Sequence, residues 1–118
     1  MNHPVLCDVL WSDPFYKGCS STGKCLWDDS DTIPFQPNTK RNCGSLFRRN
    51  GLELFLKENQ LGHLIRGHQF LSYGMAPDEH SLCFTVFSAP GYCDSDPELA
   101  CIAMIYHDTI GCKHFEKQ

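Results

Sequence analysis

Apolar runs alternate with polar and turn-forming stretches along this chain, and the pattern predicts short strands around one helix. Over residues 51–60 the spacing is helical, because Leu52, Phe55 and Leu56 fall at positions i, i+3 and i+4. Asn50 stands just before this stretch and is a suitable N-cap. We expect an amphipathic helix that lies on a core and has no cofactor role.

The other apolar runs are short and predict strands. Residues 5–11 predict a strand that breaks at Ser12-Asp13-Pro14, a turn signal. Leu64 and Ile65 predict a short buried strand whose end presents His68. Aromatic and β-branched residues predict three further strands, at residues 82–87, 101–106 and 109–115, with His107-Asp108 as the turn between the last two.

Two stretches lack a clear period. Residues 16–38 are rich in Gly, Ser, Asp and Pro and predict a long loop, and residues 70–80 predict a hairpin-like connection. The order is then strand, long loop, helix, strand and an antiparallel run. This order predicts an α/β fold, or α+β by a strict count of layers.

Length and charge limit the function classes. A chain of 118 residues forms one domain or part of one, and its 42% hydrophobic and 20% charged residues are typical of a globular protein. The formal net charge of -4 and the lack of a basic stripe argue against a nucleic-acid partner. No run approaches a membrane span and no secretory signal is visible, so we expect no membrane partner and a cytoplasmic or nuclear location.

Cysteine is abundant, with eight residues in the sequence. Several lie inside apolar runs, and without a secretory signal we expect reduced, mostly buried thiols. A small disulfide-rich secreted domain is the alternative that the even count allows. The sequence gives little support for a zinc cluster, because no Cys-x-x-Cys pair occurs.

Candidate chemistry lies where strands end in loops, since rigid elements position ligand-binding side chains there. Asp13 follows the first predicted strand, and the alternative for it is a turn residue that bonds its own backbone. Arg41 ends the long loop, where its planar guanidinium suits an anion, although most such arginines are simply solvated. His68 and Tyr92 follow the two later apolar runs.

Three successive landmarks of this sequence resemble those of the serine/threonine protein phosphatases, which are metallophosphoesterases. The landmarks are Trp11-Ser12-Asp13-Pro14, Ile65-Arg66-Gly67-His68-Gln69 and Ser88-Ala89-Pro90-Gly91-Tyr92-Cys93. This combination of motifs is specific, and the motifs follow one another in the order found in the family. The segment Asn38-Thr39-Lys40-Arg41 is similar to the family's approach to a phosphate-binding arginine. The resemblance implies a partial metallophosphoesterase β-sandwich with mostly antiparallel C-terminal strands.

The resemblance also implies roles for four residues. His68 would be a ligand of one ion in a two-metal centre of Mn, Fe or Zn, and Arg41 would contact the substrate phosphate. Asp13 would hold the arginine, and Tyr92 would line the groove. The implied reaction is the hydrolysis of phosphoserine or phosphothreonine by a metal-bridging water. The implied partners are a phosphoprotein substrate and regulatory subunits.

The family's other metal ligands lie in motifs that this sequence lacks: Gly-Asp-x-His-Gly, Gly-Asp-x-x-Asp-Arg-Gly and Gly-Asn-His-Glu. Asp78-Glu79-His80 matches one of them by letters only, without the flanking glycines. One histidine does not hold two cations, since a divalent site needs roughly three or four protein ligands. We therefore expect residues 1–118 to be a single partial domain, the C-terminal part of a catalytic domain.

On this interpretation the chain alone is inactive and binds no stable metal centre. Two alternatives stay open. One is a non-catalytic remnant or protein-binding module on the same fold, because a partial domain exposes strand edges and apolar faces that invite a partner. The other is that the sequence is a mispredicted product of a longer gene, since the same exposed surface predicts poor solubility.

Overall fold

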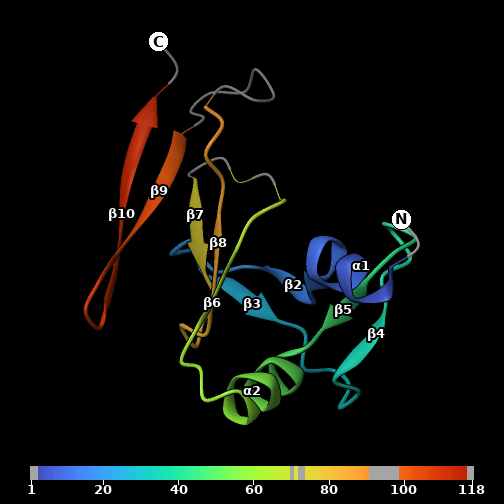
Figure 1. Cartoon of the computed structure of the whole chain (residues 1–118). Coiled ribbons are helices and arrows are strands. Elements are labelled where there is room, and N and C mark those ends of the chain that lie inside the picture. Colours follow the sequence, from blue (N-terminus) through green and yellow to red (C-terminus); the bar gives the residue numbers. More distant parts are fainter. Residues whose placement is uncertain (1–2, 70, 72–73, 91–98, 117–118) are drawn as a thin grey trace.

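Two helices and ten short strands make up the described part of the chain, residues 3–69, 71, 74–90 and 99–116 of the computed structural model (Figure 1). The helices are α1 (Pro4–Trp11) and α2 (Arg49–Glu58). The strands are β1 (Asp13–Pro14), β2 (Tyr16–Cys19), β3 (Cys25–Trp27), β4 (Phe35–Pro37), β5 (Ser45–Phe47), β6 (Leu64–Arg66), β7 (Met75–Pro77), β8 (Cys83–Val86), β9 (Leu99–Tyr106) and β10 (Thr109–Glu116). Among the described residues, no helix is long and apolar enough to cross a membrane.

The first apolar run forms helix α1, so the predicted strand over residues 5–11 is wrong. Pro4 occupies the start of the helix, where its fixed φ suits the first turn and its missing N–H costs nothing. No residue of α1 is buried. The run from Pro4 to Trp11 is apolar at every position except Asp8, so it has no polar face whose 3.6-residue period would distinguish a helix from a strand.

Helix α2 confirms the predicted amphipathic helix. Leu52 and Leu56 are only 3% and 4% exposed, whereas Phe55 is 47% exposed, so the apolar stripe is narrower than expected. The helix begins and ends two residues earlier than predicted, and its N-cap is Arg48 rather than Asn50. Arg48 is buried, and its guanidinium donates to the carbonyl of Ile33 at 2.9 Å.

Residues 16–38 are not the structureless loop that the sequence predicted. Strands β2 and β3 pair as an antiparallel hairpin, and β4 pairs antiparallel with β5. These strands are three or four residues long and contain or adjoin Gly and Pro, so they show too little alternation to be recognised. Trp27 of β3 is fully buried in the core.

The strands form four small sheets, of which two are mixed and two are antiparallel pairs. Strand β1 runs parallel to β5, and β8 lies between parallel β6 and antiparallel β7. Strand β7 falls within the predicted connection at residues 70–80. Strands β9 and β10 pair antiparallel, with Thr109 opposite Tyr106, which confirms the turn at His107-Asp108.

The core lies between α2 and strands β3, β5 and β8 (Figure 1). It consists of Trp27, Phe47, Leu52, Leu56 and Cys83. Leu64 of β6 packs against this cluster and is partly buried, whereas Ile65 is 37% exposed rather than buried as expected. Two helices with mixed sheets confirm the predicted α/β class.

No disulfide joins the seven cysteines in the described part of the chain, but only three of the seven are buried, so the expectation that most are buried is wrong for these residues. Cys83 is fully buried beside the aromatic core residues. Burial raises the pKa of its thiol from the ordinary 9.0 to about 11. Burial likewise raises the pKa of Cys25 to about 12.

The raised pKa values of these two thiols predict that the folded protein becomes less stable in alkaline solution. The thiol ionises near pH 9.0 in the unfolded chain but only near pH 11 in folded Cys83. The unfolded state therefore loses its proton first, and the free energy of unfolding falls as the pH rises from 9.0 to 11. Below pH 9.0 the contribution is fully present. We expect the urea midpoint to fall across this range, and to fall less in Cys83→Val. Cys19→Ser, an exposed site, is the control, and an equal fall in all three proteins would contradict the assignment.

Candidate functional site

Asp13 is the centre of a charged cluster formed by segments far apart in the sequence. Its side chain is buried and accepts hydrogen bonds from two arginines. Arg41 pairs with it in a bidentate way, through Nε to Oδ2 at 2.5 Å and through Nη2 to Oδ1 at 3.2 Å. Arg66 donates from Nη2 to Oδ1 at 2.7 Å. Asp13 therefore holds and orients both guanidinium groups.

Asn38 completes the support of Asp13. Its side-chain amide donates to Oδ2 of Asp13 at 2.9 Å and to the carbonyl of Trp11 at 3.2 Å. One carboxylate between two guanidinium groups leaves a formal charge of +1 in the cluster. Burial lowers the pKa of Arg66, and the neighbouring Asp13 opposes that shift. The excess positive charge suits an anionic ligand.

The backbone explains why these residues meet. Asp13 begins β1 opposite Leu46 of β5, so the loop before β5 passes along the end of α1. Gly44 in that loop has a φ of +73°, and a Cβ there would lie 2.7 Å from the carbonyl carbon of Trp11. The loop closes with the N–H of Arg41 donating to the carbonyl of Asn38 at 3.3 Å. The close approach places Arg41 beside Asp13.

His68 joins the same cluster from the end of β6. Its Nδ1 lies 3.0 Å from the carbonyl of Leu10, and its ring lies 4.8 Å from that of Trp11. Its carbonyl accepts a hydrogen bond from Nη2 of Arg41 at 2.9 Å. His68 has a φ of +72°, an uncommon conformation for a non-glycine residue. His68 is exposed, and because Nδ1 is engaged with the carbonyl of Leu10, Nε2 is the ring nitrogen left for a ligand.

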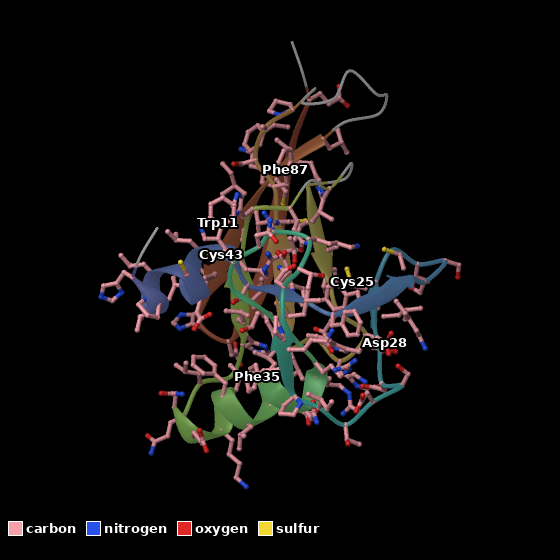
Figure 2. All side chains as sticks on the ribbon, turned by 90° about the vertical axis from the view of Figure 1, so that its right-hand side faces the viewer. Trp11, Cys25, Asp28, Phe35, Cys43 and Phe87 are labelled. Atoms are coloured by element: carbon pink, nitrogen blue, oxygen red, sulfur yellow. The ribbon has the colours of Figure 1, made fainter. Side chains whose placement is uncertain are left out.

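An open cleft of about 610 Å³ runs beside this cluster, between α1 and β6. Trp11, Arg66 and His68 are among its lining residues. Asp13 and Arg41 are not, so the cleft borders the charged cluster from one side. Figure 2 labels Trp11 and Cys43 near the inner end of α1, the blue helix.

The structure therefore brings together three of the four site residues named from the sequence. Asp13 does not bond its own turn, and Arg41 is not simply solvated, because its side chain is only 22% exposed and is paired. Tyr92 lies outside the described residues. Sequence analysis missed Arg66 and Asn38 as members of the site. A cationic residue within an apolar strand was the available signal, since burial of Arg66 requires an anionic partner.

The metal-binding capacity of the cluster is limited to His68. A carbonyl partner on one ring nitrogen is the usual arrangement of a metal-binding histidine, so Nε2 fits as a ligand. Within the described ranges, the only group of three or more close Cys, His, Asp or Glu ligands lies elsewhere, in the β9–β10 hairpin. The residues present therefore do not fit a complete two-metal centre.

No protein-family model matches the chain. Serine/threonine-protein phosphatase 5 of Rattus norvegicus is 35% identical over 89 residues, 75% of this chain and 15% of that protein. The serine/threonine-protein phosphatase 4 catalytic subunit of Eremothecium gossypii is 32% identical over 104 residues, 88% of this chain and 28% of that protein.

A solved structure shows the same fold. It is a protein serine/threonine phosphatase from Saccharomyces cerevisiae with similarity to human phosphatase PP5, at 23% identity and a TM-score of 0.64. The match covers 92% of this chain and 33% of that one, so the chain spans about a third or less of these proteins. The chain therefore shares its fold with part of that phosphatase, in line with the α/β fold expected from the sequence. Over about three quarters of its length, this chain is homologous to the serine/threonine protein phosphatases.

Proposed function

We propose that this chain supplies the phosphate-binding side of a phosphoprotein phosphatase site. The reaction would be the hydrolysis of phosphoserine or phosphothreonine, with a phosphoprotein as substrate. Residues 1–118 would form the C-terminal part of a catalytic domain, and the rest of that domain would supply the other metal ligands. The chain alone would then be inactive and hold no two-metal centre.

The observation that supports this proposal is the fixed position of Arg41 beside His68. Asp13 and the carbonyl of His68 occupy Nε and Nη2 of Arg41. Among the described residues, no hydrogen bond uses Nη1, so this nitrogen is available to an anion. A guanidinium that is already oriented loses little conformational entropy when it binds phosphate. Arg66, behind Asp13, keeps the net charge positive.

His68 supports the same assignment because its Nε2 lies on the exposed side of the cluster. Its backbone bond to Arg41 fixes the histidine relative to the phosphate-binding arginine. A ligand that contacts both residues would have a phosphoryl oxygen near Nη1 and another near the imidazole. This geometry matches the requirement that catalytic groups be held in place before substrate binds.

Phosphate binding by the full 118-residue chain tests the proposal. We expect weak binding of a phosphoserine peptide, measured by NMR shift titration. Arg41→Ala should lower the affinity at least about tenfold. A charged hydrogen bond contributes about 1.5–3 kcal/mol, and about 1.4 kcal/mol corresponds to tenfold in affinity. Arg49→Ala is the matched control, because Arg49 at the start of α2 forms exposed ion pairs with Asp29 and with Glu53. Equal affinity in Arg41→Ala would overturn the site assignment.

An activity assay tests the second part of the proposal. The chain with added manganese should show no hydrolysis of the phosphopeptide above the blank. Turnover that disappears in His68→Ala would show that the chain completes its own metal site. Failure of the wild-type chain to bind phosphate would favour the alternative, a protein-contact module.

One observation favours that alternative function. Helix α1 projects from the body of the molecule (blue in Figure 2), and Val5 and Val9 are 62% and 74% exposed. A second, largely apolar cleft of about 550 Å³ lies between α1, β5 and α2. Exposed apolar surface of this kind marks a contact with another polypeptide segment. The same surface would receive the rest of a catalytic domain under the first proposal.

A further inference from the structure

The β9–β10 hairpin carries three soft metal-ligand side chains on one face. His114 lies directly opposite Cys101 in the ladder, and Cys112 lies opposite Ala103. Side chains two apart on a strand share a face, as do directly opposed residues. Cys101, Cys112 and His114 therefore all project from the same side of the hairpin.

Their ligand atoms are already close to a metal-binding arrangement. Sγ of Cys112 lies 3.7 Å from Nδ1 and 3.8 Å from Nε2 of His114, and the ligand atoms of all three residues lie within 4.8 Å of one another. Zinc bonds of about 2.3 Å to sulfur and about 2.0–2.1 Å to nitrogen place tetrahedral ligand atoms about 3.5–3.8 Å apart. Adjustment of about 1 Å or less would complete the geometry.

The three ligands differ in how firmly the fold holds them. Cys101 is fully buried against Gly74, where an added Cβ would lie 2.6 Å from the Cβ of Cys101. Its N–H donates to the carbonyl of Phe87 at 2.9 Å, which attaches β9 to the body of the protein. Cys112 and His114 lie on β10, in which no residue is buried. A metal shared by all three would fasten the exposed strand to the anchored one.

We propose that Cys101, Cys112 and His114 form a zinc site with a fourth position open to water. Two thiolates and one imidazole are a soft ligand set that selects Zn²⁺ over Mg²⁺, Ca²⁺ or Mn²⁺. Two thiolates also neutralise the dication. The site is separate from the Asp13 cluster and independent of the proposed phosphatase function. Its role is to stabilise the hairpin, because a two-stranded ribbon is marginal without further support.

Cobalt substitution and zinc competition test this site on the reduced 118-residue chain. We expect a tetrahedral cobalt spectrum with a thiolate charge-transfer band, lost on adding zinc, and at least one tight equivalent of zinc. Cys112→Ser and His114→Gln should each weaken zinc binding at least about tenfold, because even supporting residues around a metal contribute 10–100-fold. Both residues are exposed, so both variants should keep the fold, which far-ultraviolet circular dichroism would check.

Matched controls are available in the same chain. Cys19→Ser removes an exposed cysteine from the other hairpin, and His107→Gln changes the turn of this hairpin; neither should alter zinc affinity. Zinc should also slow amide hydrogen exchange in β10 of the wild type but not of Cys112→Ser. Unchanged zinc affinity in Cys112→Ser would overturn the proposal. A cobalt spectrum without thiolate bands would do the same, as would a Cys101–Cys112 disulfide that forms in preference to zinc binding.

Discussion

Replacing Asp78 by alanine is expected to cost about 3–5 kcal/mol of folding free energy, because four N–H donors would lose their acceptor in or near the core. The Asp78 side chain is fully buried. It accepts from the indole of Trp27 at 2.7 Å, and from the backbone N–H groups of His80, Leu82 and Cys83. Urea unfolding at neutral pH measures the change.

Two further variants separate this effect from a general loss of charge. Asp78→Asn keeps one carbonyl oxygen as an acceptor and should fall between the wild type and the alanine variant. Asp108→Ala, in the exposed turn after β9, should change stability by less than about 0.5 kcal/mol. If Asp78→Ala were as stable as Asp108→Ala, the buried hydrogen bonds of Asp78 would not support the core as described.

Asp13→Ala is expected to produce the second large effect, a loss of about 3 kcal/mol together with loss of phosphopeptide binding. The substitution leaves the mostly buried guanidinium of Arg66 without its anionic partner, since that side chain is only 10% exposed. It also releases Arg41 from its bidentate pair, so the guanidinium is no longer oriented toward a ligand. Urea unfolding and the peptide titration report the two consequences separately.

A double substitution distinguishes unpaired charge from loss of packing. Asp13→Ala combined with Arg66→Met removes the buried cation along with its partner, so stability should recover while phosphopeptide binding stays weak. Asp28→Ala is the control, since this carboxylate accepts its hydrogen bonds from the neighbouring Ser30 and lies outside the Asp13 cluster. Full recovery of binding in the double variant would show that Asp13 does not position Arg41.

The parts of the fold that could be predicted were those with strong local patterns. Helix α2 has a buried stripe, and β8, β9 and β10 are rich in aromatic or β-branched residues, so period and propensity agreed. The sequence did not predict helix α1, none of whose residues is buried. It did not predict strands β2 to β4 either, because strands of three or four residues carry little signal. Pro4 was the local sign of a helix start in the first run.

The residues of the candidate site likewise divide into those that the sequence predicted and those that it did not. The proximity of Asp13, Arg41 and His68 followed from the family resemblance, and periodicity alone would not have brought them together. The one signal for Arg66 was its place in an apolar strand, but its anionic partner Asp13 is 53 residues away in the sequence and is brought to it only by tertiary packing. The zinc ligands were missed because Cys101 and His114 become neighbours only through the register of the hairpin, which the search for Cys-x-x-Cys spacing ignores.

The spacing of the Asp13 partners along the chain has a consequence for how the protein folds. Arg41 and Arg66 reach Asp13 from 28 and 53 residues away, and β1–β5 and β6–β8 are parallel pairs that require crossovers. The β9–β10 ribbon, by contrast, closes across two residues. Contacts of long sequence separation carry the larger loop-closure entropy and form slowly. The ribbon should therefore gain its hydrogen bonds early in refolding, and the arginine pairs of Asp13 should be among the last native contacts made.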